Sequence, residues 1–159
     1  MKKRILFVCL GNICRSPAAE GVFLSLLKKK DLQDQFYVDS AGTGAWHVGN
    51  KAHERMSQAA QKRGISLESF ARQIKLEDLY SFDFILTMDN ENLAVIQSLA
   101  HESNKKLNVI IRPILSYSSR TNLSEVPDPY YGGQNGFEKV LDLLEDACQG
   151  LLEELIGQE

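Results

Sequence analysis

The chain of 159 residues has no long apolar run, few cysteines and no excess of basic residues. No stretch approaches the roughly 20 apolar residues of a membrane span, and the basic start 1–4 leads into a strand-like run rather than a signal peptide. Three cysteines, an odd number, cannot form a closed disulfide framework, which is typical of a reducing compartment. We therefore expect a cytoplasmic protein without a membrane segment.

Charge and ligand chemistry argue against two further classes. The net charge is −3, so we expect no binding to nucleic acid or to an anionic membrane surface. The three histidines are scattered along the chain, and no cluster of histidine, cysteine or carboxylate side chains has metal-ligand spacing. We therefore expect neither a metal nor a cofactor.

What the chain does have is an alternation of strand-like and helix-like segments. Strands are expected at 4–9, 35–40, 83–88 and 108–112, and helices at 19–27, 50–63, 76–80, 90–100 and 137–155. Strands that alternate with helices favour an α/β fold in which helices cover both faces of a parallel sheet. The length suits a single domain, expected to span residues 1–159. The stretch 113–135 lacks regular periodicity, and a loop of that length is usually functional.

The most informative segment is CLGNICRS at residues 9–16, which lies between an apolar run and a helix start. A loop in this position points backbone N–H groups inward, and the helix behind it adds the positive end of its dipole. Cys9, at the loop entry, is expected to be held there as a thiolate. Arg15, at the exit, offers a planar fork that suits two phosphoryl oxygens. The segment therefore predicts an oxyanion cradle with a nucleophile at its base, which makes a buried structural cysteine the weaker interpretation.

Other loop residues fit the same interpretation. Gly11 and Asn12 are residue types that readily adopt the left-handed backbone angles of a tight anion nest. Ser16 is predicted to cap the following helix, and its hydroxyl could also donate to the thiolate. Pro17 suits the first helical position because its missing N–H would have no helical partner there.

Residues 8–17 resemble the signature loop of the low-molecular-weight protein tyrosine phosphatases. The block Asp128-Pro129-Tyr130-Tyr131-Gly132-Gly133 resembles the general-acid loop of that family. Three further blocks, 39–43, 71–73 and 87–89, together with Trp46, fall in family order, so the similarity spans essentially the whole chain. The resemblance implies a four-stranded parallel sheet in the order 2-1-3-4, with helices on both faces and the phosphate-binding loop after strand 1.

The activity implied by the resemblance is hydrolysis of phosphotyrosine and aryl phosphates through a phosphocysteine intermediate, without a metal. Cys9 is the nucleophile, Arg15 binds the phosphoryl oxygens, and Asp128 protonates the leaving phenolate and then acts as a base. Taken alone, Asp128 would more often be an ordinary Asp-Pro turn. The implied substrates are tyrosine-phosphorylated proteins, among them autophosphorylated tyrosine kinases, and the implied enzyme is a monomer that also binds phosphate-like oxyanions.

Aromatic residues are candidates for the rim of the cradle. If Trp46, Tyr130 and Tyr131 flank it, they form a slot that a phenyl phosphate can reach and a shorter serine phosphate cannot. Trp46 could instead be a core anchor. Further apolar walls are expected from Leu10 and Ile13. The candidate phosphate-contacting set also includes the loop residues Gly11, Asn12, Cys14 and Ser16.

Behind the loop, the resemblance assigns a supporting hydrogen-bond network to Asn12, Ser16 and Ser40. Family members often carry the motif His-x-Ala-Arg-Gln, whereas residues 69–73 of this chain begin with Ser69. The network must therefore close differently in this chain, or through water.

Two residues have two interpretations each. Asp89 either contacts Arg15 or the loop, or caps the helix that follows it. Cys14 either pairs reversibly with Cys9, as the family resemblance implies, or is a buried packing residue.

Two other functions are compatible with such a loop. An arsenate reductase would share the anion loop, but one type needs two more mid-chain cysteines, and none lies between Cys14 and Cys148. A glutathione-dependent reductase needs fewer cysteines, so the reductase class stays open. A phosphotyrosine-binding module without turnover would be expected to lack Cys9 or Asp128, and both are present.

Overall fold

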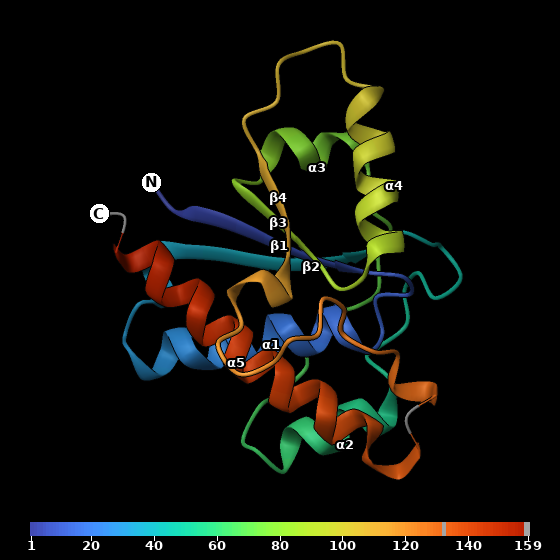
Figure 1. Cartoon of the computed structure of the whole chain (residues 1–159), viewed down its shortest axis with the longest axis vertical. Helices are drawn as coiled ribbons and strands as arrows, with labels where there is room; N and C mark the ends of the chain where they lie inside the picture. Colours follow the sequence, from blue (N-terminus) through green and yellow to red (C-terminus); the bar gives the residue numbers. More distant parts are fainter. Residues whose placement is uncertain (132, 158–159) are drawn as a thin grey trace.

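Four parallel strands form the centre of the computed structural model, which describes residues 1–131 and 133–157 (Figure 1). They are β1 (Lys3–Cys9), β2 (Phe36–Gly42), β3 (Phe84–Thr87) and β4 (Ile110–Pro113). The strand order is β2-β1-β3-β4, and each neighbouring pair is parallel. The predicted α/β fold, its single domain and its 2-1-3-4 sheet are therefore confirmed.

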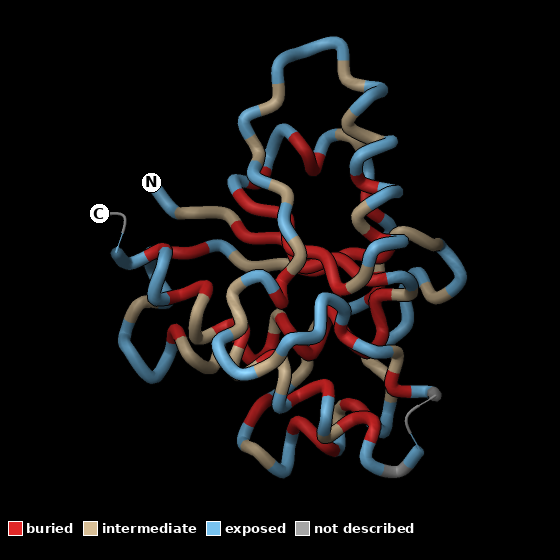
Figure 2. The backbone as a smooth tube through the Cα atoms, in the orientation of Figure 1, coloured by how far each residue is buried: buried red, intermediate tan, exposed pale blue. Residues whose placement is uncertain are grey.

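Helices cover both faces of this sheet. Helices α1 (Arg15–Lys29), α2 (Glu54–Gln61) and α5 (Gly136–Gly157) lie on one face, and α3 (Leu76–Ser81) and α4 (Asn90–His101) on the other (Figure 1). Because successive side chains of a strand point to opposite faces, β1 contributes to both layers. Ile5, Phe7 and Cys9 join the core with α1 and α5, whereas Leu6 and Val8 join the core with α3 and α4. Figure 2 shows the buried residues gathered along the central strands and the inner faces of the helices, whereas no residue of the edge strand β4 is buried.

The topology places a crevice at the end of β1. The chain leaves β1 through α1 on one face to reach β2, and it leaves β3 through α4 on the other face to reach β4. Ligands of such sheets bind beyond the carboxyl ends of the strands, where the direction of winding reverses. The loop that follows Cys9 lies at this point.

Two expectations about secondary structure were wrong. The helix expected at 50–63 is shorter, because Asn50 and Lys51 pair instead with residues 70–71: the Ala71 amide donates to the Asn50 carbonyl at 2.8 Å, and Lys51 bridges to Phe70. The stretch 113–135 is not without regular structure. It contains three short 3₁₀ helices: η2 (Ile114–Tyr117), η3 (Pro129–Tyr131) and η4 (Gly133–Asn135).

Within the residues that the structure describes, no helix combines the length and the apolar character needed to cross a bilayer. No group of three or more histidine, cysteine, aspartate or glutamate side chains in the same part of the chain could hold a metal ion.

Candidate active site

The backbone carbonyls of the loop after β1 are tied away from its centre. Four of them accept hydrogen bonds from amides outside the loop. The bonds run from Thr43 to Cys9 (2.9 Å), from Gly44 to Leu10 (2.9 Å), from His53 to Ile13 (2.7 Å) and from Ala18 to Cys14 (3.1 Å). No described residue accepts a hydrogen bond from the amides of Gly11, Ile13 or Cys14. With its carbonyls held outward, the loop leaves these N–H groups for an anion.

Asn12 and Gly11 achieve this shape in different ways. Asn12 adopts a left-handed backbone with φ of 56°. Gly11, contrary to expectation, is not left-handed; a Cβ atom there would lie 3.0 Å from His47 Cδ2, so glycine permits a close approach. Gly42 at the end of β2 has the same role, because its Cβ would lie 2.7 Å from the Leu10 carbonyl oxygen. The loop is therefore packed tightly against its neighbours.

Cys9 lies at the base of the loop with two hydrogen-bond partners at its sulfur. The Asn12 backbone N–H donates to Sγ at 3.2 Å, and Ser16 Oγ lies 3.0 Å from Sγ. The predicted helix cap at Ser16 was wrong: α1 begins at Arg15, and its cap residue Cys14 makes no side-chain capping bond. The Ser16 hydroxyl is occupied by Cys9 and Asn12 instead. The sulfur therefore lies within hydrogen-bond distance of a backbone N–H and a hydroxyl group.

Arg15 is buried beside the loop and is held by one nitrogen only. Its Nη1 donates to Asp89 Oδ2 at 2.8 Å and to the Val126 carbonyl at 3.0 Å. No described residue accepts a hydrogen bond from Nε or Nη2. This edge of the guanidinium therefore remains for two oxygens of a bound phosphoryl group.

Asp89 performs both of the roles that its position in the sequence suggested. One carboxylate oxygen pairs with Arg15, and the other accepts from the Asn92 amide at 2.8 Å to cap α4. A single side chain thus fixes the arginine relative to the helix on the opposite face of the sheet.

A pocket of about 180 Å³ opens above the loop. Its lining residues are Cys9, Leu10, Gly11, Ile13, Cys14, Arg15, Trp46, His47, Asp128, Pro129 and Tyr130. Asp128 Oδ1 accepts from the Tyr130 amide at 2.9 Å, and no described residue donates to Oδ2. Asp128 therefore forms the local turn expected of an Asp-Pro sequence and also lies at the pocket. The nucleophile, arginine and acid candidates come together around one cavity.

The rim of this pocket is aromatic. Trp46 is 73% exposed and Tyr130 is 59% exposed, so Trp46 is not the core anchor that the sequence left open. The side chain of Tyr131 and the residue Gly132 lie outside the described part of the chain.

Two histidines were missed by the sequence analysis. His47 lines the pocket directly after Trp46. The ring of His53 packs edge-on against Tyr130, with centroids 5.1 Å apart, and stacks on Phe137 at 5.5 Å. Since the His53 amide also donates to Ile13, this residue joins the loop to the aromatic rim. The position of His47 beside Trp46 was a usable signal, whereas nothing in the sequence indicated the packing of His53.

Hydrogen bonds behind the loop connect Asn12, Ser16 and Ser40. The Asn12 amide nitrogen Nδ2 donates to Ser16 Oγ at 2.7 Å and to Ser40 Oγ at 3.0 Å. Asn12 Oδ1 accepts from the Arg72 backbone amide at 3.0 Å. Ser69 makes none of these bonds. Burial raises the pKa of the nearby Glu20 carboxyl, and the Ser69 hydroxyl partly opposes that rise.

Cys14 is buried and free, as are Cys9 and Cys148. Burial and the neighbouring Cys9 raise the pKa of the Cys14 thiol to about 12. At neutral pH Cys14 is therefore a neutral thiol, which makes it the weaker candidate for a nucleophile.

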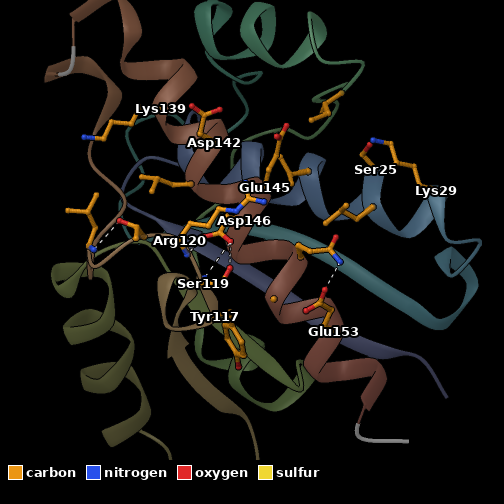
Figure 3. Close-up of a pocket in the computed structure, with 18 residues that line it drawn as sticks. Ser25, Lys29, Tyr117, Ser119, Arg120, Lys139, Asp142, Glu145, Asp146 and Glu153 are labelled. Carbon is orange, nitrogen blue, oxygen red and sulfur yellow. Dashed lines mark hydrogen bonds between the residues drawn. The ribbon is translucent and has the colours of Figure 1, made fainter.

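A larger groove of about 1030 Å³ lies along α1 and α5 (Figure 3). Its carboxylates are already engaged: Asp146 accepts from Ser118 and Ser119, and Asp142 and Glu145 pair with Arg63. Of the described residues that line it, none is a cysteine or a histidine. The larger of the two cavities is therefore not the better candidate for the reactive site.

Known proteins match this chain over nearly its whole length. A family model described as low molecular weight phosphotyrosine protein phosphatase matches residues 4–159. The low molecular weight protein-tyrosine-phosphatase YfkJ of Bacillus subtilis is 44% identical over 149 residues, which cover 93% of this chain and 92% of that protein. A crystal structure of a protein tyrosine phosphatase from Entamoeba histolytica, with Hepes in its active site, has a TM-score of 0.92 and 38% identity over 99% of both chains.

A third relative is named for a different substrate. The crystal structure of DARP, a Drosophila arginine phosphatase, has a TM-score of 0.90 and 35% identity over 98% of both chains. Proteins named for different substrates thus share this fold. The family model and the Bacillus subtilis relative, however, are both named for phosphotyrosine or protein tyrosine. This chain belongs to the low molecular weight phosphotyrosine protein phosphatase family.

Proposed function

We propose that this tyrosine phosphatase hydrolyses phosphotyrosine in proteins, and other aryl phosphate monoesters, through a phosphocysteine intermediate on Cys9. The main support is the convergence of Cys9, Arg15 and Asp128 on one pocket beneath an aromatic rim. Each supplies what the reaction needs: a nucleophile, a bidentate cation and a proton donor.

In the first step the Cys9 thiolate attacks phosphorus, so that an S–P bond forms while the P–O bond to the phenol breaks. The Arg15 edge and the loop amides stabilise the equatorial oxygens, whose charge persists throughout the transfer. Asp128 gives its proton to the departing phenolate. Phenol leaves, and the phosphoryl group remains on sulfur.

In the second step water attacks the phosphocysteine. The Asp128 carboxylate takes a proton from that water, the S–P bond breaks, and inorganic phosphate leaves. The Cys9 thiolate is regenerated, with Ser16 and the Asn12 amide positioned to stabilise the returning charge.

Replacement of Asp128 by alanine is expected to slow hydrolysis of phenyl phosphate by about 10² to 10⁴, the usual contribution of general acid catalysis. The loss should be much smaller with p-nitrophenyl phosphate, because p-nitrophenolate leaves without a proton. Steady-state kcat for the two substrates, with the wild-type protein measured in parallel, checks this. Equal losses on both substrates would assign the acid role to another residue.

Replacement of Trp46 by alanine is expected to lower kcat/KM for phosphotyrosine peptides by about 10-fold, the effect of removing an aromatic anchor at a binding surface. Inhibition by inorganic phosphate should change little, since phosphate reaches only the loop. Tyr80→Ala, which removes another exposed aromatic side chain from α3, is the matched control. Equal losses for phosphotyrosine and for a small alkyl phosphate would contradict an aromatic slot.

The experiment that tests the proposed function compares phosphate release from phosphotyrosine, phosphoserine and phosphoarginine peptides in EDTA. We expect the phosphotyrosine peptide to be hydrolysed most rapidly, because the pocket walls are apolar and aromatic. Preference for phosphoarginine would assign the activity named for the Drosophila relative. Thiol-dependent arsenate reduction that exceeds aryl phosphate turnover would assign a reductase, and binding without release would assign a recognition module.

The proposal extends to cellular context. Cys9, Arg15 and Asp128 all come from one chain, so a monomer has the full set of candidate groups. Free thiols persist most readily in a reducing compartment, which supports a cytoplasmic location. Autophosphorylated tyrosine kinases are a suitable substrate class, since they present phosphotyrosine on a protein surface. Sedimentation of the active protein tests the monomer.

A further inference from the structure

Glu20 is a titratable residue that the proposed reaction does not use. It lies on α1 four residues after Ser16, and residues at this spacing share a helix face. Its Oε1 accepts a hydrogen bond from Ser40 Oγ at 2.5 Å. Ser40 is only 1% exposed and comes from β2, so this bond joins the helix behind the loop to the neighbouring strand.

The hydrogens of this network can be assigned one after another. The Arg72 amide donates to Asn12 Oδ1, which orients the Asn12 side chain so that both protons of Nδ2 go to Ser16 and Ser40. Ser40 therefore accepts from Asn12, and its own proton goes to Glu20.

The same assignment fixes the proton of Ser16. Because Ser16 Oγ accepts from Asn12, its hydroxyl proton is free to donate to Cys9 Sγ at 3.0 Å; the competing acceptor, the Ala41 carbonyl, is farther away at 3.4 Å. A continuous series of hydrogen bonds thus runs from Glu20 through Ser40, Asn12 and Ser16 to the sulfur.

The Glu20 carboxylate is partly buried, and serine hydroxyls are among the few groups that stabilise its charge. Burial raises the pKa of its carboxyl, and the nearby Asp39 raises it further, whereas Ser40, Ser69 and Arg72 lower it. Arg72 is already paired with Asp39 and Asp78, each at 3.0 Å. No ion pair within the described residues includes Glu20.

We propose that Glu20 is a positioning residue for the nucleophile: by accepting a hydrogen bond from Ser40 it holds Asn12 in its left-handed conformation and keeps the Ser16 hydroxyl directed at Cys9. The inference rests on the proposed function only in naming Cys9 as the nucleophile. Loss of the acceptor frees Ser40 to turn, which removes one of the three side-chain hydrogen bonds that hold Asn12.

Glu20→Ala tests this through two readouts. We expect kcat for p-nitrophenyl phosphate to fall by about 10- to 100-fold, the size of loss that a small misplacement of reacting groups produces, with KM little changed. We also expect the pH dependence of Cys9 alkylation by iodoacetate to move upward by about one pH unit, because a hydrogen bond to the charged sulfur is weakened. Glu20→Gln keeps an acceptor oxygen and should restore both values.

Asp146→Ala is the matched control, because Asp146 also accepts hydrogen bonds from serine hydroxyls but does so in the groove along α5. It should leave the alkylation profile of Cys9 unchanged. If Glu20→Ala does not fold, Ser40→Ala removes the same link from the other side and should produce the same shift. The proposal fails if folded Glu20→Ala keeps the wild-type alkylation profile, or if Glu20→Gln shifts it as far as alanine does. Alkylation needs no turnover, so this result stands apart from whether the protein is a phosphatase.

Discussion

Replacing Cys9 with serine is expected to reduce phosphate release by about 10⁴-fold or more, as for loss of a catalytic nucleophile. A serine hydroxyl at this site has no base beside it, because the loop presents hydrogen-bond donors to that position. The oxyanion site itself should survive, since the loop amides and Arg15 are unchanged. Release of phosphate from phenyl phosphate, together with calorimetric binding of inorganic phosphate, measures both expectations.

Cys148→Ala is the control for this substitution. It removes another buried thiol, from α5 and away from the pocket, and should retain activity wherever the protein remains folded. Substantial turnover by folded Cys9→Ser would remove Cys9 from the mechanism.

Replacing Arg15 with lysine should cost about 10³-fold in kcat/KM, in the range by which an arginine stabilises phosphoryl transfer. Lysine keeps the charge but lacks the Nε and Nη2 donors with which arginine can hold two phosphoryl oxygens. A lysine ammonium also cannot bind Asp89 and the Val126 carbonyl with the geometry of Arg15 Nη1. Steady-state kinetics with p-nitrophenyl phosphate measures the loss.

Arg63→Lys is a suitable comparison, because Arg63 pairs with Glu138, Asp142 and Glu145 at a distance from the loop. It should change kcat/KM little. A loss below 10-fold for Arg15→Lys would mean that the guanidinium does not contact phosphate directly.

The sequence was most informative where chemistry and backbone geometry coincide. Cys9, Arg15 and the turn at Asn12 lie within eight residues, so a local motif was sufficient to predict the cradle. Asp128 lies more than a hundred residues away, and only the resemblance to a family connected it with the loop. The sheet order likewise followed from the resemblance, because alternation of strands and helices fixes a parallel sheet but not which strand lies beside which.

The sequence was least informative where several weak contacts decide the structure. Gly11 was expected to be left-handed, yet it is not, and its lack of a side chain instead leaves room for His47, a contact that depends on a distant loop. Ser16 was expected to cap α1, but its hydroxyl is drawn to the sulfur and to Asn12. Apart from its spacing from Ser16, nothing in the sequence indicated a role for Glu20. The role can be inferred only from the structure, in which Ser40 of β2 donates a hydrogen bond to Glu20.

Chemical trapping of the intermediate tests the central claim most directly. The protein is mixed with ³²P-labelled phenyl phosphate, quenched in acid during turnover, digested and mapped. We predict that the label is bound through sulfur to the peptide that contains Cys9, and that it is absent from Cys9→Ser. Label on any other residue, or full turnover with no labelled protein at any time after mixing, would contradict covalent catalysis by Cys9.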